Sequence, residues 1–513
     1  MNNKEEEGYG NGVTFSTISE DVNSEFKKNG NRNIFEEVVD QFTLDKFTND
    51  KGIYDYIKSL PLEDKRLSIL SLLGEDNDIY NKIYNSIKSN NVSKLDHLKD
   101  TLRLIRDFIK FGTVERKKFG EIMTPIKELA LPMVELVDKY DEEFWKNPNH
   151  KVLDSSAGLG TFLILCAGKF MNGLKEFEPD IEKRFKYIVE NCLYYGELQS
   201  RNVFLWLCLI DPNDEYLTNT YFGSFLDDDF DKHMKDVWKL DNFNLIIQNP
   251  PYQSSTSGGN GARDLWDKFV YKSTDLLKSD GHMIFVHPSK WRSPEHKCLK
   301  MFKKYNLKFL EIHSDSDGSK VFGANTRYDF YCLQKSEYEG VTKIVDELGE
   351  EHNINIMKWE WIPNYNFKLI SRIISDENVL NVIYSRGMYG NDKKWMSKEK
   401  TEKNNLPCVY GMYKDYTCSY RYSSEDKGHF GISKVILGLG RYLYPLIDIN
   451  GEFGIMNNAF ALPITSLEEG INIKNAIESE KFKEIIKSTK WSNFQVNWKM
   501  FKSFKKDFWK EFI

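Results

Sequence analysis

The chain has 513 residues, of which 40% are hydrophobic and 29% charged, with a net charge of −6, an ordinary balance for a globular protein of several domains. No apolar run is long enough to span a bilayer, and the polar first ten residues lack a signal core. We therefore expect a cytoplasmic protein, or one of the host cell interior if it is viral. Its seven cysteines include no CxxC pair, which argues against structural zinc or a disulfide framework.

Residues 1–110 are predicted to form an N-terminal extension. Residues 1–33 are polar and rich in Gly, Asn and Glu, which is typical of disorder. Apolar residues recur at helical spacing over 34–111, which predicts several short amphipathic helices. No Asp and Glu-x-Lys metal site of an endonuclease is evident there, so we expect this segment to support the core or a partner.

Short apolar runs alternate with helical patterns over 111–345, which predicts a mostly parallel α/β sheet. A helix is expected at Thr161–Phe170, and Tyr187–Tyr195 is apolar-rich. The strand-like runs lie at Val152–Leu153, Phe243–Ile247, Met283–Val286 and Tyr328–Leu333.

A glycine-rich turn, Asp154–Thr161, follows the first of these runs and opens a helix. Glycines here let a ligand approach the backbone, and Asp154 at a strand end can take the amino group of a cationic cofactor. Glu197, after the next apolar stretch, can accept hydrogen bonds from ribose hydroxyls. The alternative interpretation of the glycine-rich turn is that it serves packing alone. The alternative for Glu197 is a solvated acid on a loop.

Upstream, Phe119–Pro125 precedes a helix that we expect to begin near Ile126. Thr124 is predicted to cap this helix, and Pro125 suits its first turn. A helix N-terminus also attracts a carboxylate.

The tetrapeptide Asn249-Pro250-Pro251-Tyr252 falls at the end of the Phe243–Ile247 run. The prolines stiffen the turn and fix Asn249 and the carbonyl of Pro250 as rigid acceptors. Two acceptors that hold the two N–H groups of an exocyclic amine turn its lone pair toward an electrophilic methyl group. Tyr252 would stack on a base rotated out of a duplex. A plain turn at a strand end is the alternative interpretation.

Two histidines, His282 and His287, lie on the following strand-like run. We predict no catalytic role for them and no metal site, because no paired group or metal cluster is evident. The Ser/Gly-rich stretch Ser254–Gly261 could close over a flipped base or be a plain linker.

Taken in order, these elements resemble the gamma class of N6-adenine DNA methyltransferases, found in restriction-modification systems and in viral and solitary relatives. The matching segments, over about Val114–Lys335, are Phe119–Pro125, Asp154–Thr161, Glu197, Gly223–Leu226, Asn249–Tyr252, Leu276–Trp291 and Val321–Lys335. The resemblance implies a Rossmann-like methyltransferase sheet over 111–345 and a C-terminal α+β target-recognition domain over 346–513.

The resemblance also implies roles for single residues, with S-adenosylmethionine as cofactor and double-stranded DNA as partner. Asn249, Pro250, Pro251 and Tyr252 would be catalytic, and Tyr252 and Phe322 would hold the target base. A separate restriction endonuclease or helper subunit is a further expected partner. The cofactor would contact Phe119, Thr124, Pro125, Asp154, Ser156, Gly158, Gly160, Glu197, Ser224 and Phe225.

Two departures from the class pattern keep alternatives open. Ser155 stands where the cofactor loop has Pro, and Ser224 stands where many relatives have Asp. An inactive, DNA-binding relative is therefore one alternative. Methylation of a planar amino group in RNA or protein is another, because the same tetrapeptide serves those substrates.

The C-terminal third carries 24 Lys and Arg against 19 Asp and Glu over 351–513, whereas the rest of the chain is acidic. This excess favours a polyanionic partner. Nine lysines of Lys481–Ile513 are interleaved with aromatic residues, which we interpret as core. Cations that could contact DNA are Arg421, Lys427, Lys434 and Arg441.

Overall fold

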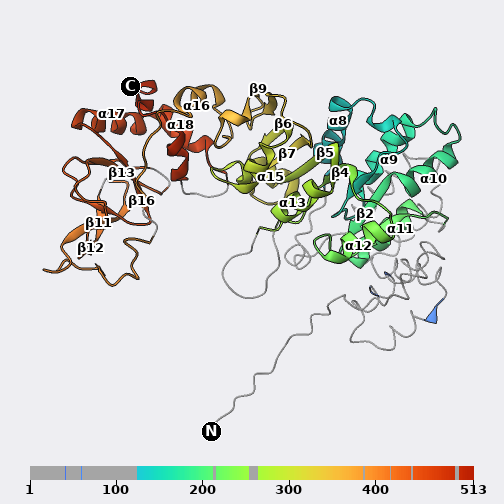
Figure 1. Cartoon of the computed structure of the whole chain (residues 1–513), viewed down its shortest axis with the longest axis horizontal. Helices are drawn as coiled ribbons and strands as arrows, with labels where there is room; N and C mark the ends of the chain where they lie inside the picture. The colour runs from blue at the N-terminus through green and yellow to red at the C-terminus, as the bar shows by residue number, and fades with distance from the viewer. Residues whose placement is uncertain are drawn as a thin grey trace, which may run out of the picture. The chain divides into compact units, whose positions relative to one another are not determined.

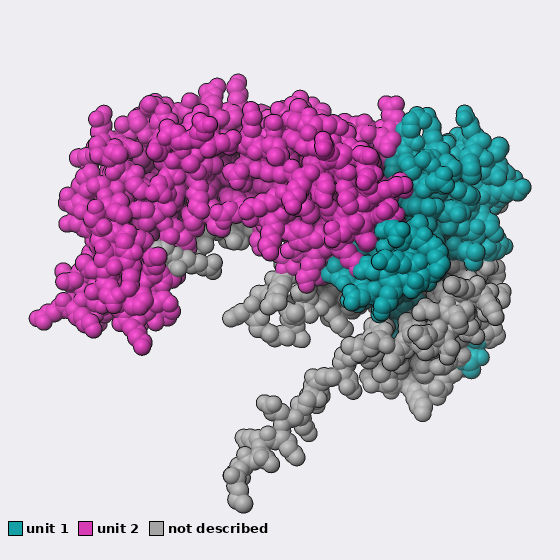
Figure 2. Space-filling model, viewed as in Figure 1, with its two compact units in different colours: residues 1–113, 143–241 teal, residues 114–142, 242–513 magenta. Residues whose placement is uncertain are grey.

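The computed structural model describes residues 38, 41, 59–60, 124–211, 215–252, 264–384, 387–415, 417–440, 443–491 and 496–513. They belong to two compact units, coloured separately in Figure 2. Unit 1 comprises residues 1–113 and 143–241, and unit 2 comprises residues 114–142 and 242–513. The predictions for 1–33 and for Ser254–Gly261 lie outside the described residues, as do those for 34–111 apart from four positions.

The main sheet has nine strands in the order β3-β2-β1-β4-β5-β7-β6-β8-β9. Figure 1 labels β4, β5, β6 and β7 among them. In unit 1, β1 (Val152–Asp154), β2 (Leu193–Glu197) and β3 (Asn219–Phe222) pair in parallel. Unit 2 contributes β4 (Phe243–Gln248), β5 (Leu277–Pro288), β6 (Asn306–His313), β7 (Tyr328–Gln334), β8 (Thr342–Val345) and β9 (Glu351–Ile354). The four strands predicted from apolar runs are thereby confirmed.

The expectation of a mostly parallel sheet is only partly correct. Strands β4 and β5 are parallel, but β7 runs antiparallel to both of its neighbours, β5 and β6. The sheet is therefore mixed, as larger sheets often are. A buried strand is apolar on both faces whichever way it runs, so its sequence does not reveal its direction.

The helices of unit 1 explain two sequence patterns. The apolar helix predicted from Thr161 is α9 (Thr161–Gly173), which is buried almost all round. The Tyr187–Tyr195 run is divided between a helix end and β2. The other helices of this unit are η2 (Phe144–Lys146), α10 (Ile181–Asn191), α11 (Ser200–Ile210) and α12 (Asp228–Asp236).

In unit 2 the helices that accompany β4 to β9 are short, and one begins differently from the prediction. Pro125, not Thr124, occupies the N-cap position, no side chain caps this end, and the first turn is a π-helix. The elements are η1 (Ile126–Ala130), α8 (Leu131–Tyr140), α13 (Trp266–Leu276), η3 (Ser289–Arg292), α14 (Lys297–Phe302) and α15 (Asp315–Phe322).

The remainder of unit 2 is a small region of strands and helices. A four-stranded sheet, β10-β12-β11-β15, and a three-stranded sheet, β14-β13-β16, share a core that includes Val409 and Ile436. Its strands are β10 (Met396–Ser397), β11 (Leu406–Met412), β12 (Cys418–Ser423), β13 (Lys434–Gly438), β14 (Leu446–Asp448), β15 (Gly454–Ile455) and β16 (Ala459–Pro463). Its helices are η4 (Ile356–Lys358), α16 (Phe367–Ile373), α17 (Leu467–Glu478), α18 (Glu480–Ser488), η5 (Trp498–Ser503) and η6 (Phe508–Glu511).

The aromatic residues of the last segment form core, as predicted. Phe482 packs against Phe501, Phe504 and Phe508, and all four rings are buried. Among the described helices, none combines the length and apolarity needed to cross a bilayer.

One buried arginine ties the main sheet to the chain that leads into this region. Arg292, in η3, forms a two-pronged ion pair with Asp329 of β7, at 2.7 and 3.1 Å, and both side chains are 0% exposed. Its other N–H groups donate to the carbonyls of Ile362 and Pro363 and to Asn364 Oδ1, at 2.8–3.1 Å. The guanidinium charge is thus surrounded by acceptors inside the protein.

Candidate active site

The glycine-rich turn after β1 contains two glycines, Gly158 and Gly160, whose surroundings differ. Both have positive φ, +54° at Gly158 and +76° at Gly160. A Cβ on Gly160 would lie 2.2 Å from the Trp206 ring, so this glycine is required by packing against α11. A Cβ on Gly158 would have no heavy atom within 4 Å. The backbone at Gly158 therefore borders open space.

Glu197, at the end of β2, is bonded directly to this turn. Its Oε2 accepts from the Gly158 N–H at 2.9 Å, and its Oε1 accepts from the Gln199 N–H at 2.8 Å. Tyr195 of the same strand donates its hydroxyl to the Gly158 carbonyl at 2.6 Å and stacks on Trp206. Tyr195 was not predicted from the sequence, because its role depends on a contact across strands.

Asp154 lies at the end of β1 and is 1% exposed. Its Oδ1 accepts from the Ser156 N–H at 3.2 Å. Burial raises the pKa of Asp154 well above its usual value, and the Glu197 carboxylate adds to that shift. A cation placed beside Asp154 would favour its charged form.

The segment after β3 joins the same group of strand ends. The Gly223 N–H donates to the Glu197 carbonyl at 2.9 Å. Ser224 Oγ accepts from the Leu226 N–H at 3.3 Å, and Phe225 is 2% exposed with its ring edge-on to Phe230. The sequence-predicted residues of β1, β2 and β3 thus gather at the carboxyl ends of three parallel strands, where open α/β sheets bind ligands.

In unit 2, Asn249-Pro250-Pro251-Tyr252 directly follows β4. Asn249 Nδ2 donates to Thr124 Oγ1 at 3.3 Å. The Tyr252 carbonyl accepts from the Leu265 N–H at 3.1 Å, which links the turn to the residue that precedes α13. Burial raises the pKa of Tyr252, and its hydroxyl has no hydrogen-bond partner among the described residues.

Phe322 and Tyr252 are brought together although they lie far apart in the sequence. Their ring centroids are 6.0 Å apart with the planes at 80°. Phe322 ends α15, which a Ser314–Asp317 capping box begins and a left-handed Gly323 ends. It also packs edge-on against Tyr328, 4.9 Å away. Phe119, predicted alongside these residues, lies outside the described chain.

The two histidines on β5 sit in the core. His287 Nε2 lies 3.0 Å from the Tyr331 hydroxyl, and its ring stacks on Trp266. Burial lowers the pKa of His287 to about 3, so the ring is neutral at physiological pH. His282 is 2% exposed, and its Nε2 lies 3.6 Å from an Asp141 oxygen. Both therefore have packing partners that the sequence did not reveal.

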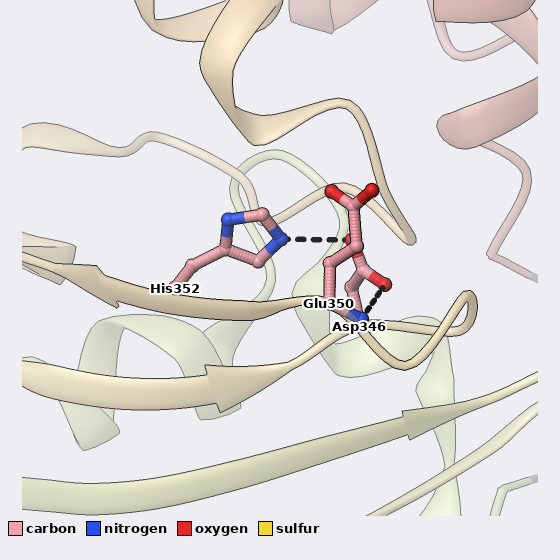
Figure 3. A group of neighbouring side chains, drawn as sticks. All are labelled: Asp346, Glu350 and His352. Carbon is pink, nitrogen blue, oxygen red and sulfur yellow. Dashed lines mark hydrogen bonds and ion pairs between the residues drawn. The ribbon is translucent and has the colours of Figure 1, made fainter.

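One group of side chains with metal-ligating chemistry gathers in the described chain, at Asp346, Glu350 and His352 (Figure 3). Asp346 Oδ1 accepts from the Leu348 and Glu350 N–H groups, at 2.9 and 3.0 Å, and His352 Nε2 lies 2.8 Å from Asp346 Oδ2. The buried Asp346 carboxylate therefore has hydrogen-bond partners of its own, and these bonds stabilise the turn between β8 and β9.

The cations suggested as DNA contacts have different environments. The expectation that Lys434 contacts DNA is wrong. Its side chain is 0% exposed and donates to Asp448, 2.6 Å away, and to the carbonyls of His429 and Ile432. Arg421 lies over the Tyr410 ring, with 4.3 Å from its guanidinium carbon to the centroid. Lys427 lies over Trp395 at the same distance. Arg441 is outside the described residues.

Comparison with known proteins relates the chain to one group of enzymes. A family model described as Eco57I restriction-modification methylase matches residues 180–322. An uncharacterized adenine-specific methylase of Mycoplasma pneumoniae is 24% identical over 328 residues, covering 50% of this chain and 76% of that protein. The modification methylase CviBIII of Paramecium bursaria Chlorella virus NC1A is 27% identical over 193 residues, covering 36% and 41%.

Among solved structures, the type IIL restriction-modification enzyme MmeI in complex with DNA has a TM-score of 0.45 and 10% identity, covering 79% of this chain and 70% of that one. This is a weak overall likeness. From the sequence matches, the chain is homologous to Eco57I-family, adenine-specific DNA methyltransferases of restriction-modification systems. The resemblance predicted from its motifs is thereby confirmed.

Proposed function

We propose that the protein transfers a methyl group from S-adenosylmethionine to the N6 amino group of adenine in a specific double-stranded DNA sequence, after rotating the base out of the duplex. The observation that carries this proposal is the Asn249–Tyr252 turn at the carboxyl end of β4, with Phe322 beside Tyr252. The homology to adenine-specific DNA methyltransferases supports it.

The residues of unit 1 fit S-adenosylmethionine, which when bound supplies an electrophilic methyl group. The open space beside Gly158 leaves the backbone accessible, and the buried Asp154 suits a cationic amino group. A carboxylate has about four acceptor sites, so Glu197 can accept ribose hydroxyls in addition to its backbone donors. Ser156, Gly160, Ser224 and Phe225 complete this proposed set in unit 1.

In unit 2 the proposed chemistry is positioning. Asn249 Oδ1 and the Pro250 carbonyl accept the two N–H groups of the adenine amine, which localises its lone pair. Pro251 keeps the turn rigid because its φ is fixed. Tyr252 stacks on one face of the flipped base and Phe322 contacts the other, which requires the two rings to turn from their perpendicular arrangement.

We further propose that residues 346–513 recognise the target sequence, with residues 1–110 as an extension and 111–345 as the methyltransferase domain. Arg421 and Lys427 each lie over an aromatic ring, and neither is fully buried. Such cations suit phosphate or base contacts. A separate endonuclease or helper subunit is a proposed partner.

The two glycines of the β1 turn allow a test of the cofactor site. Gly160→Ala should lower the free energy of unfolding by about 2–4 kcal/mol, because its Cβ meets Trp206 in a strained backbone. Gly158→Ala should cost only the backbone strain, about 1–2 kcal/mol, but weaken S-adenosylmethionine binding tenfold or more. Denaturant unfolding and calorimetry measure the two effects. Wild-type cofactor affinity in Gly158→Ala would argue against a cofactor at this turn.

The activity itself is tested with labelled S-adenosylmethionine on duplex DNA, RNA and protein. We expect label in DNA as N6-methyladenine, and none in a duplex made only of G and C. Label in RNA or protein instead would favour the alternative substrates. No cofactor binding would indicate an inactive relative, in which Ser155 and Ser224 are the suspected causes.

A further inference from the structure

Helix α15 carries a glycine, Gly318, in its middle, where glycine weakens a helix relative to alanine. Packing explains its presence. A Cβ on Gly318 would lie 1.9 Å from the Thr326 carbonyl oxygen and 3.0 Å from the Thr326 carbonyl carbon. Both atoms belong to the backbone, so they cannot turn aside as the end of a side chain can. Residues 323–327, the return segment between α15 and β7, therefore cross the helix at a place where glycine is required.

This contact lies one helical turn before Phe322. Gly318 and Phe322 are four residues apart, so they share one face of α15, and both are buried. The Phe322 ring lies 6.0 Å from the Tyr252 ring and 4.9 Å from the Tyr328 ring, measured between centroids. A shift of the helix at Gly318 would therefore move Phe322 relative to Tyr252.

Hydrogen bonds hold both the start of α15 and the end of the return segment. Ser314 Oγ accepts from the Asp317 N–H at 3.2 Å and donates to Asp317 Oδ2 at 2.7 Å, which caps the helix. Arg327 donates to both carboxylate oxygens of Glu347, at 3.0 and 3.3 Å, and its carbonyl accepts from the Ser289 N–H at 3.2 Å. Because the return segment is tied to the sheet in this way, we expect an added Cβ to displace the helix.

We propose that Gly318 is a positioning residue for the target base, because its contact with the return segment sets the position of α15 and so holds Phe322 opposite Tyr252. The inference rests on the proposed function and adds to it a residue that does not touch the substrate. A base held between two rings needs about 7 Å between the ring planes, since carbon atoms pack at about 3.5 Å on each side. A gap of about 1 Å already forfeits up to about half of that attraction.

The test combines Gly318→Ala with Phe322→Leu, singly and together, on a duplex whose target adenine is first mapped with the wild-type enzyme. Gly318→Ala should lower the single-turnover rate about tenfold, the loss expected when one base–aromatic contact weakens. Calorimetric binding of S-adenosylmethionine should stay within about twofold of wild type. The double variant should lose little more than Phe322→Leu alone, because Gly318 acts through Phe322. Ser316→Ala, at an exposed position of the same helix, is the matched control and should keep the wild-type rate.

A second duplex, with the target adenine opposite a mismatched base, separates base capture from general damage to the domain. A mismatched base leaves the duplex at lower cost, so the loss in Gly318→Ala should fall to about threefold or less. Ser314→Ala removes the helix cap without adding an atom and should cause a smaller loss of the same kind. If Gly318→Ala does not fold, Ser314→Ala combined with Phe322→Leu takes its place.

Two results would overturn the inference. One is a loss in the double variant equal to the product of the two single losses, which would mean that the helix and Phe322 act independently. The other is an equal loss on the paired and mismatched duplexes, which general damage would produce. An inactive wild-type protein would overturn the proposed function and the inference with it, whereas an active wild type with an unaffected Gly318→Ala overturns the inference alone.

Discussion

Replacing Asn249 by alanine should reduce methyl transfer to DNA by about 10²- to 10³-fold while leaving S-adenosylmethionine binding within about twofold of wild type. The amine of adenine is a poor nucleophile because its lone pair is delocalised into the ring. In the proposed reaction two acceptors localise that lone pair, and the substitution removes one of them. The prolines that follow keep the other, the Pro250 carbonyl, in place.

The measurement is single-turnover incorporation of labelled methyl groups into duplex DNA, alongside calorimetric binding of the cofactor. A matched control is Asn353→Ala, because Asn353 is exposed on β9 and has no proposed part in the reaction. Wild-type rates in Asn249→Ala would contradict the assignment of the turn. A loss of cofactor affinity as large as the loss of rate would instead make Asn249 a cofactor ligand.

The parts of this site that could be predicted from sequence are local. A buried apolar run followed by Asn-Pro-Pro defines a strand and its rigid end, and β4 ends at Gln248, directly before the turn. Gly158 and Gly160 mark positive φ after β1 in the same way. Residue type and spacing are sufficient here, because the chemistry of a strand end depends on a few consecutive residues.

The parts that could not be predicted depend on contacts between distant segments. The bond from Asn249 to Thr124 is one example, and the incorrect prediction of Thr124 as a helix cap is its counterpart. The expectation that Lys434 contacts DNA requires an exposed side chain, as lysines usually have, but Lys434 is 0% exposed. Its burial against Asp448 requires a carboxylate from the neighbouring antiparallel strand, which no local pattern reveals.

The second large effect expected concerns stability and falls on Arg292. Arg292→Ala should lower the free energy of unfolding by about 3–5 kcal/mol, because it leaves the Asp329 carboxylate buried without its counter-charge. The same substitution leaves Asn364 Oδ1 and two backbone carbonyls without these donors. Asn364 in turn donates to the Lys490 carbonyl at 2.9 Å, so the loss of hydrogen bonding should extend from the main sheet into the C-terminal region. Urea unfolding followed by tryptophan fluorescence measures the loss.

Two comparisons decide whether the buried charge is the cause. Lys290→Ala removes an ion pair from the same short helix, but Lys290 and Asp264 are 46% and 35% exposed, so it should cost no more than about 1 kcal/mol. The double variant Arg292→Met with Asp329→Leu removes both charges and keeps the volume, and it should be more stable than Arg292→Ala. If the double variant were as unstable as the single one, the lost bonds to residues 362–364 would be the main cause, and the ion pair would contribute little.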